Sequence, residues 1–288
     1  LLLILFYYSS SKLTKWKQEY KAKIEEDYAV GGQRNWMQVF ASSILATTVG
    51  IAFYLLCGED QHISFGEPAD STNNLALFGF TMNKSTLAAY LWAIYIAHYC
   101  TANADTWASE LGVLSKNEPR LVTTLFLRKV PRGTNGGMST FGTAASGAGG
   151  LFIGAIFYVC SLSHMVGGPV VAAQYPVLVY SLLCGLLGSL VDSLMGATLQ
   201  ATYFSTERKC IVKHGGATET ARDKSIVRIC GADLLSNEAV NFWSIFVTMV
   251  LSVWLAPNVY CWVDGAQCYE ADRLNSTLLA FVTSFTTK

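Results

Sequence analysis

Long apolar runs, separated by polar segments, extend along most of the chain. Six runs approach the roughly 20 residues that cross a bilayer core, and they cover residues 39–57, 87–104, 144–166, 170–190, 242–256 and 278–288. Residues 1–8 are also apolar and follow no basic segment, so we interpret them as the tail of a truncated transmembrane helix, not as a signal peptide. The pattern predicts an all-α fold: a polytopic transmembrane helical bundle of about seven helices, forming a single integral-membrane domain over residues 1–288.

The composition agrees with a membrane protein. Hydrophobic residues make up 52% of the chain and charged residues only 14%, against roughly a quarter charged in soluble domains. The net charge is zero, which argues against a nucleic-acid binder. None of the eight cysteines belongs to a cluster with zinc-ligand spacing. Cys261 and Cys268 share one polar segment, where both a disulfide and free thiols remain open.

Basic residues indicate which segments face the cytosol. Seventeen of the twenty lysines and arginines lie in residues 9–36, 112–140 and 203–236. The intervening loops contain only Lys84 and Arg273. The positive-inside rule therefore predicts that the three basic segments are cytosolic.

Acidic residues near the cytosolic ends of two apolar runs suggest a metal site. Asp105 ends one run, with Asn103 and Glu110 beside it, and Asp192 lies near the end of another. Carboxylates next to apolar helices generally face a polar interior, a partner or an ion. Mg²⁺ prefers oxygen ligands, often one or two carboxylates completed by water and phosphates. We therefore predict a Mg²⁺ site at Asp105 and Asp192, supported by Asn103 and Glu110. The alternative is that the two aspartates pair with Lys or Arg as structural contacts.

A glycine-rich segment between these acids suggests phosphate binding. Glycines permit backbone conformations in which successive N–H groups converge on an anion. Lys129 and Arg132 flank this segment, and the next helix would direct its positive N-terminal end to the same anion. No Walker A motif occurs in the chain. The predicted phosphate-binding residues are Gly133, Thr134, Asn135, Gly136, Gly137 and Ser139. For the later glycines, residues 142–150, we favour close helix packing.

Two further segments complete the candidate site. Helical spacing would place Asp233, Asn237 and Asn241 on one face, where they could act as metal or phosphate ligands. The alternative there is helix capping by Asp233 or Ser236. Arg34 and Asn35 precede a membrane entry, and Arg34 could also hold a phosphate.

Five ordered motifs together resemble the transmembrane protein 19 family. They are GGQRNW (residues 31–36), DTWASELG (105–112), VPRGTNGG (130–137), DSLMGATLQ (192–200) and GADLLSNEAVN (231–241). The family includes the plant phytyl-phosphate kinase. The resemblance implies nucleotide-dependent phosphorylation of an isoprenyl monophosphate, with CTP as the favoured donor and the prenyl diphosphate as product.

Residue chemistry and resemblance lead to one set of expectations. Asp105 and Asp192 would bind Mg²⁺, and Lys129, Arg132 and the glycine-rich loop would hold the nucleotide phosphates. Arg34, Asn35 and the polar face of residues 233–241 would orient the acceptor phosphate. The site would lie on the cytosolic face of the endoplasmic reticulum, or of the plastid envelope in a plant. A lipid-phosphate cytidylyltransferase and a membrane transporter of ions or phosphorylated solutes remain alternatives, and the oligomeric state stays open.

Overall fold

The computed structural model is mainly helical and describes residues 1–26, 36–58, 62–68, 73–77, 80–163, 174–212 and 223–286. The long helices are α1 (Leu2–Lys15), α4 (Ile44–Leu56), α5 (Lys84–Gly112), α6 (Thr140–Ser163), α7 (Pro176–Leu199), α9 (Asn237–Val263) and α10 (Tyr269–Thr286), and the short ones are α2 (Gln18–Lys21) and α3 (Trp36–Ala41). Single 3-10 turns cover Val122–Thr124 and Gly265–Gln267.

Four helical stretches among the described residues are long and apolar enough to cross a membrane. They are Gln38–Leu56, Thr140–Leu162, Pro176–Leu199 and Asn237–Val263. The protein is thus a helical membrane protein, as the apolar runs predicted. Two of the six predicted runs differ from this picture. Residues 87–104 lie in the more polar helix α5, and residues 278–286 lie in α10, whose first turns carry Glu270 and Asp272.

Helix α5 is the centre of the bundle, since α1, α4, α6, α7 and α9 all pack against it. This position explains why α5 tolerates polar side chains. His98, Thr101 and Asn103 are fully buried within protein, where neighbouring helices, not lipid, surround them. Tyr180 of α7 donates a hydrogen bond to the carbonyl oxygen of Ala93 over 2.8 Å, which joins α7 to this central helix.

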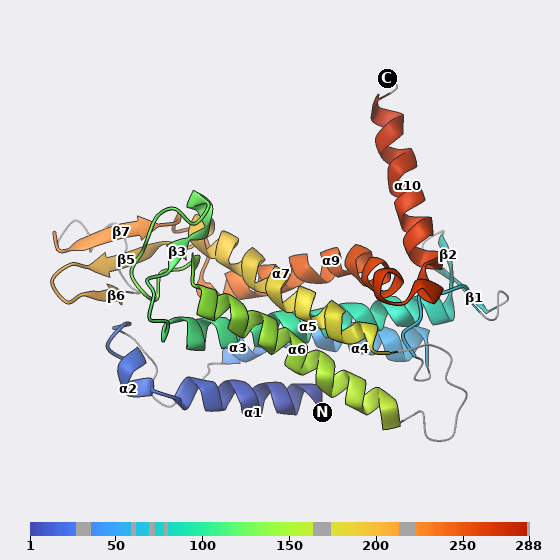
Figure 1. The fold of residues 1–288 in the computed structure, drawn as a ribbon, viewed down its shortest axis with the longest axis horizontal. Helices are drawn as coiled ribbons and strands as arrows, with labels where there is room; N and C mark the ends of the chain where they lie inside the picture. Colours follow the sequence, from blue (N-terminus) through green and yellow to red (C-terminus); the bar gives the residue numbers. More distant parts are fainter. Residues whose placement is uncertain are drawn as a thin grey trace.

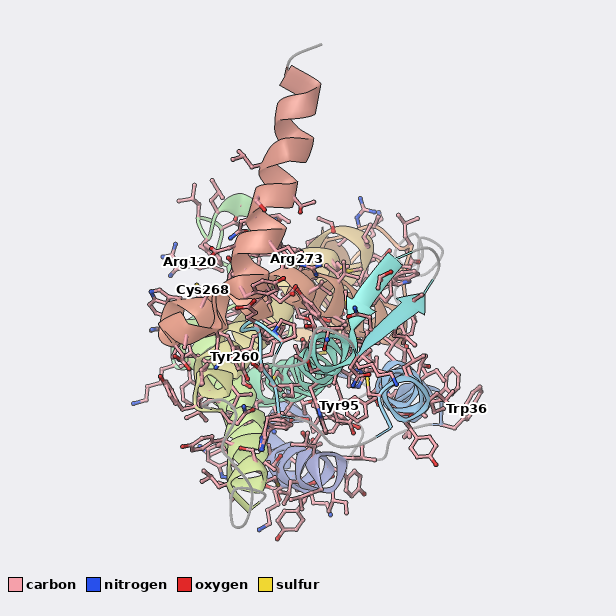
Figure 2. The ribbon with its side chains drawn as sticks, turned by 90° about the vertical axis from the view of Figure 1, so that its right-hand side faces the viewer. Trp36, Tyr95, Arg120, Tyr260, Cys268 and Arg273 are labelled. Atoms are coloured by element: carbon pink, nitrogen blue, oxygen red, sulfur yellow. A yellow bond between two sulfur atoms is a disulfide. The ribbon has the colours of Figure 1, made fainter. Side chains whose placement is uncertain are left out.

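Side chains sort between the core and the outer surface as expected for a bundle in lipid. Tyr260 of α9 is completely buried and packs edge-on against Phe65, with ring centroids 5.2 Å apart. Trp36, in contrast, is 74% exposed and projects from the side of the bundle (Figure 2). Exposed aromatic and aliphatic residues of this kind are compatible with a hydrocarbon environment.

Small β-sheets, which an all-α prediction leaves out, connect the helices. Two-stranded antiparallel sheets are formed by β1 (Asn74–Leu77) with β2 (Phe80–Asn83) and by β3 (Arg120–Leu121) with β4 (Gly137–Met138). A three-stranded antiparallel sheet has the order β6-β5-β7, with β5 at Thr202–Ser205, β6 at Cys210–Val212 and β7 at Ile226–Cys230. The all-α prediction is therefore wrong for these polar segments, because short strands have little hydrophobic periodicity of their own.

The three basic segments meet at one end of the bundle. Figure 1 shows α2, β3 and the β5–β7 sheet at that end, and the β1–β2 hairpin and α10 at the other. Arg132 donates to the hydroxyl of Tyr20 over 2.5 Å, and Ile211 N–H donates to the carbonyl oxygen of Ile24 over 2.8 Å. Arg128 reaches the carbonyl oxygen of Ile229 over 3.3 Å. Residues from all three segments therefore form one polar end.

The opposite end contains a disulfide. Cys261, near the end of α9, is bonded to Cys268, which directly precedes α10. Glu270 accepts hydrogen bonds from Tyr90 over 3.2 Å and from Arg273 over 2.8 Å. The sequence left the pairing of these cysteines open, and in the structure they are paired.

Candidate functional site

The last turns of α5 present their polar side chains on two opposite faces. An α-helix turns about 100° per residue, so Asp105 lies roughly 200° around the helix from Asn103 and roughly 140° from Glu110. Asn103 and Glu110 are seven residues apart and share a face. The prediction that all three would serve one metal ion therefore conflicts with the geometry of the helix.

Asp105 meets Asp192 where α5 packs against α7. Both residues are partly buried, and their carboxyl groups interact directly. Among the described residues, neither carboxylate forms an ion pair with a lysine or an arginine. Two carboxyl groups in contact repel one another unless a proton or a bound cation offsets their charge. The structural alternative, in which each aspartate pairs with a basic side chain, is not adopted in this part of the chain.

Helix α9 supplies donors that hold Asp192 in place. The hydroxyl of Ser244 donates to Asp192 Oδ2 over 2.9 Å. The amide of Asn241, oriented to satisfy its neighbours, donates to the same oxygen over 3.2 Å and to the carbonyl oxygen of Asn237, also over 3.2 Å. The carboxyl pair is therefore positioned by three helices, α5, α7 and α9.

Only part of the predicted 233–241 face forms. Helix α9 begins at Asn237, and Ser236 caps it by accepting from Ala239 N–H over 3.3 Å. Asp233 is exposed in the turn before the helix, so it does not share the helical face of Asn237 and Asn241. This outcome corresponds to the capping alternative for Ser236. Arg34 and Asn35 lie outside the described residues.

Asn103 is engaged in structural contacts on the far face of α5. It is completely buried, and its amide donates to the carbonyl oxygen of Gly149 in α6 over 2.8 Å. Its oxygen accepts from Ser10 over 3.3 Å and from Ser9 over 3.4 Å. These contacts join α1, α5 and α6, and they leave no reason to include Asn103 among metal ligands.

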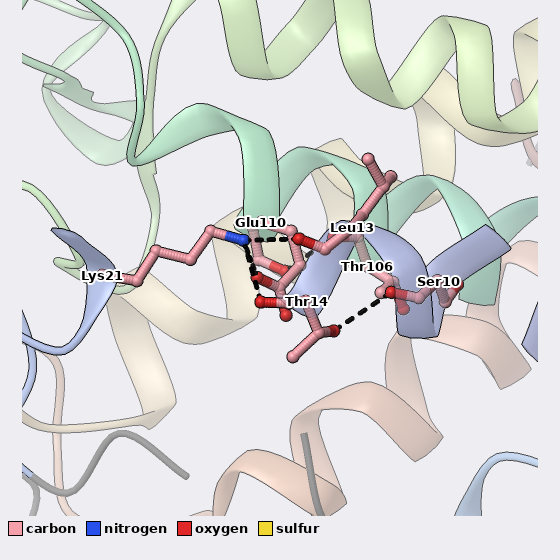
Figure 3. Close-up of polar contacts among 7 residues, drawn as sticks. Ser10, Leu13, Thr14, Lys21, Thr106 and Glu110 are labelled. Atoms are coloured by element: carbon pink, nitrogen blue, oxygen red, sulfur yellow. Dashed lines mark hydrogen bonds and ion pairs between the residues drawn. The ribbon is translucent and has the colours of Figure 1, made fainter. Parts of the chain in front are cut away.

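Glu110 also has a structural partner. Lys21 is only 2% exposed, and its ammonium group lies 2.5 Å from Glu110 Oε2 (Figure 3). The same ammonium donates to the carbonyl oxygens of Leu13 over 2.7 Å and of Thr14 over 3.4 Å. Because these carbonyls end α1, Lys21 binds both a carboxylate and the negative end of a helix. Glu110 therefore anchors the N-terminal segment and does not join the carboxyl pair.

The glycine-rich loop packs against α7 and does not form the predicted anion nest. The N–H groups of Thr134, Asn135 and Gly137 donate to Pro131 O, Thr202 Oγ1 and Thr134 O, at 3.3, 3.2 and 2.9 Å. Three of the donors expected to face an anion are thus used within the protein. The loop nevertheless lies close to the acid pair, since a Cβ on Gly136 would stand 2.5 Å from the carbonyl oxygen of Ser193, the residue after Asp192.

Side chains also fix this loop internally. The hydroxyl of buried Thr134 donates to the carbonyl oxygen of Pro131 over 2.6 Å. The thiol of Cys230 donates to the carbonyl oxygen of Asn135 over 3.4 Å, and burial raises the pKa of this thiol, which keeps it protonated as a donor. Gly133 has a φ of +83°, a conformation that favours glycine. These contacts indicate that the residues stabilise the conformation of the loop more than they contact an anion directly.

The two predicted cations lie at the same polar end. Lys129 Nζ is 3.2 Å from Glu118 Oε2, and both side chains are more than 60% exposed. Arg132 donates to Tyr20 and to the carbonyl oxygen of Lys116, while its Nε–H has no partner among the described residues. Ser139 accepts from Gly142 N–H over 3.0 Å at the start of α6. Lys129 and Ser139, together with Arg120, also line a cleft.

Two residues of this region were not predicted. Ser244 contacts Asp192 and lies three residues after Asn241, so helical spacing within α9 would have identified it. Arg120 lines the cleft, and only the β3–β4 pairing, which is invisible in hydrophobic periodicity, brings it there. Among the described residues no group of three or more His, Cys, Asp or Glu side chains gathers around one point.

Comparisons with known proteins place the chain among membrane proteins. A model of the family described as integral membrane protein DUF92 matches residues 1–249. Protein PGR of Arabidopsis thaliana is 36% identical over 253 residues, which cover 87% of this chain and 79% of PGR. An uncharacterized membrane protein of Methanocaldococcus jannaschii is 34% identical over 128 residues, 44% of each chain. One of Synechocystis sp. is 35% identical over 106 residues, 37% of this chain and 36% of its own. No solved structure gives a significant match.

Proposed function

Because the chain belongs to the DUF92 family of integral membrane proteins and is similar to the transmembrane protein 19 family, as its motifs indicated, we propose that it is a membrane phosphotransferase. It transfers a phosphoryl group from a nucleoside triphosphate, with CTP favoured, to an isoprenyl monophosphate. The observation that carries this proposal is the contact between Asp105 and Asp192, two carboxylates without a basic partner among the described residues.

The residues around this pair fit a magnesium ion. Mg²⁺ is commonly bound through one or two carboxylates, with water and substrate phosphates as its other ligands. Asp105 and Asp192 provide two carboxylates from different helices, and Ser244 and Asn241 fix the second one. When bound, Mg²⁺ would offset the negative charge of the phosphates during transfer.

Phosphoryl transfer depends mainly on positioning and charge, which these residues supply. An oxygen of the acceptor monophosphate attacks the γ-phosphorus, the bond to the β–γ bridging oxygen breaks, and the nucleoside diphosphate leaves with that electron pair. The attacking oxygen is already ionised near neutral pH, so the reaction requires no strong base. Arg132, whose buried Nε–H has no partner among the described residues, and Lys129, which is paired with Glu118 at the exposed surface, supply positive charge at the same end of the bundle.

The proposed orientation of the protein in the membrane is based on the basic residues at one end of the bundle. The positive-inside rule favours the cytosol for the end at which the basic segments meet. This placement lets a water-borne nucleotide meet a lipid acceptor at the membrane edge. We propose about seven membrane helices for the chain, and the endoplasmic reticulum, or the plastid envelope in a plant, as its location.

A labelling experiment tests the reaction and separates it from its closest competitor. Purified full-length chain is incubated with Mg²⁺, geranylgeranyl or phytyl phosphate, and CTP labelled at either the α- or the γ-phosphate. The proposal predicts γ-label, and no α-label, in a lipid diphosphate. Transfer of α-label would instead identify a cytidylyltransferase, and no transfer together with no CTP binding would favour a transporter.

A further inference from the structure

A cleft of about 870 Å³ opens beside the start of α6, between the β3–β4 segment and the groove that α6 forms with α7. This volume is within the roughly 300–1,000 Å³ typical of small-molecule sites. Of the described residues, none from α5 or α9 lines it, so the cleft is distinct from the carboxyl pair. We propose that this cleft binds a single-chain lipid with a phosphate headgroup; its role as the acceptor site rests on the proposed function.

The end of the cleft outside the helices suits a phosphate. Arg120 and Lys129 contribute two positive charges there, against one negative charge from Glu118. The Lys129–Glu118 pair is exposed to solvent on both sides, and such pairs contribute little stability, so Lys129 can turn to a bound anion at low cost. Ser139 and Thr140 lie at the positive N-terminal end of the 24-residue helix α6. Charge and donors therefore converge at one end.

The other end of the cleft is apolar and suits a hydrocarbon chain. Its walls are Ala144, Gly147 and Ala148 of α6, opposite Leu182 and Leu186 of α7. The hollow exists because the α6 residues are small, while the leucines provide apolar surface. Ala144 and Ala148 are exposed on the outer surface of α6, so this part of the cleft opens sideways toward the lipid.

The position of the cleft fixes how such a lipid would lie. Its apolar half is within the candidate spans Thr140–Leu162 and Pro176–Leu199, whereas Arg120 and Lys129 come from the segment between α5 and α6. Figure 1 shows this segment, with β3, at the end of the bundle where α6 begins. The headgroup would thus sit at the membrane edge and the chain would run along α6, the arrangement an amphiphile adopts in a bilayer.

The contact between α6 and α7 closes the back of the cleft. Helices α6 and α7 approach so closely beyond it that a Cβ on Gly150 would lie 2.9 Å from the Cα atom of Gly185. From Thr140 to Ala148 the helix rises only about 12 Å, so the cleft covers the first part of one chain and leaves the rest in the bilayer. The proposal assigns one hydrocarbon chain to this short apolar half, and a diacyl phospholipid is the alternative occupant that the competition experiment tests.

The cleft is connected to the acid pair through the glycine-rich loop. Met138 and Ser139 form part of its wall, and Gly136 of the same loop packs against Ser193, next to Asp192. A headgroup in the cleft would therefore lie beside the loop that packs next to Asp192. This arrangement links the lipid site to the proposed chemistry.

Binding measurements on purified full-length chain in detergent test the proposal. The probe is labelled geranylgeranyl phosphate, and unlabelled geranylgeraniol, inorganic phosphate and dioleoyl phosphatidic acid serve as competitors. Ala148→Phe fills the apolar half from an exposed position and should weaken binding at least about tenfold. Val159→Phe is the matched control, since Val159 is 64% exposed on α6 and does not line the cleft.

A second variant tests the polar half by removing its two positive charges, and a thermal-unfolding control accounts for the contacts of Arg120 with the carbonyl oxygens of Phe126 and Leu127. Arg120→Gln combined with Lys129→Gln should weaken binding of geranylgeranyl phosphate by roughly tenfold to a hundredfold, as expected for loss of charge-assisted contacts, and should leave competition by geranylgeraniol unchanged. Arg128→Gln is the control, because Arg128 does not line the cleft. If Ala148→Phe fails to fold, this double variant still decides the proposal.

The outcomes separate the cleft from the reaction. Normal lipid-phosphate binding by both cleft variants, with product still formed by the wild type, would overturn the cleft proposal and leave the phosphotransferase intact. Binding that both variants weaken, with no product from the wild type, would support the cleft and contradict the proposed reaction. Competition by phosphatidic acid as strong as by the single-chain probe would contradict the single-chain assignment.

Discussion

The two faces of α5 near its end carry similar polar residues but differ in their partners. On one face, Asn103 and Glu110 are bonded to α1, α6 and Lys21. On the other face, Asp105 meets a second carboxylate, Asp192. The first face has the contacts of a structural anchor, because each polar group has a complementary partner. The second face has an electrostatic conflict that a cation would resolve. The partner of a buried polar group, more than its residue type, therefore indicates whether the group has a chemical role.

Replacing either member of the carboxyl pair should have the largest effect. Asp105→Asn and Asp192→Asn keep the side-chain shape and remove a ligand charge, so turnover should fall by about 1,000-fold, equivalent to roughly 4 kcal/mol, while the protein remains folded. Steady-state assays with γ-labelled CTP would measure this loss. Glu207→Gln, an exposed position in the β5–β6 turn, is the control. Near-normal activity of both aspartate variants would refute the metal role.

Breaking the anchor on the opposite face should reduce stability instead of chemistry. Lys21→Met leaves Glu110 without its partner, and removing one member of a buried pair costs about 3 kcal/mol, the lower end of the usual range, because Glu110 remains 16% exposed. Thermal unfolding in detergent would detect the change. Lys15→Met, at an exposed position, should have little effect. A loss of turnover per folded molecule in Lys21→Met, without loss of stability, would contradict the purely structural role of the Lys21–Glu110 pair.

Asn103→Leu should produce a smaller loss of stability. The substitution keeps the approximate volume and removes the amide contacts to Gly149, Ser9 and Ser10, at a cost of about 2 kcal/mol. The Mg²⁺ concentration required for half-maximal activity should stay unchanged, since Asn103 faces away from Asp105. A clear rise in that concentration, measured by Mg²⁺ titration of the assay, would indicate that Asn103 does contribute to metal binding.

Ser244→Ala should have the smallest effect, and this effect should be on the affinity for Mg²⁺. It removes one of two donors to Asp192 and leaves Asn241 in place. We expect about a tenfold rise in the Mg²⁺ requirement, equivalent to roughly 1.4 kcal/mol, with unchanged thermal stability. Ser252→Ala is the matched control, because Ser252 is a buried serine of the same helix that donates to the carbonyl oxygen of Met249 over 2.6 Å and not to Asp192. Equal Mg²⁺ requirements in the two variants would show that Ser244 does not position the carboxylate.

The helices and the meeting of the two aspartates were predictable from the sequence, because both depend on local patterns. Long apolar runs define the membrane spans, and acidic residues at the cytosolic ends of these runs are expected at a similar depth in the membrane. The packing partners were not predictable. The pattern alone did not reveal that Lys21 would be buried against Glu110, or that Gly136 would pack against α7 instead of facing an anion. These contacts join residues far apart in the chain, and hydrophobic periodicity contains no information about them.

The residues that line the cleft were also only partly predictable from the sequence. Lys129 and Ser139 were predicted to bind phosphate from their place in a glycine-rich segment, but Arg120 was overlooked. Strands β3 and β4 are only two residues each, too short for a periodic signal, yet their pairing brings Arg120 opposite Met138. The later glycines of α6 were assigned to close helix packing, and Gly149 and Gly150 do lie against the backbones of α5 and α7. Gly147 packs against Leu182 and Leu186 and, with Ala144 and Ala148, also lines the cleft, which the sequence did not reveal.

Direct metal binding tests the central claim, that the carboxyl pair and not the opposite face of α5 holds the cation. Mn²⁺ can replace Mg²⁺ as a spectroscopic probe and can be titrated by electron paramagnetic resonance into the purified chain with a non-hydrolysable CTP analogue. A tight Mn²⁺ site is expected in the wild type and in Glu110→Gln, and it should be lost in Asp105→Asn and Asp192→Asn. Retention of the site in both aspartate variants, or its loss in Glu110→Gln alone, would contradict the account.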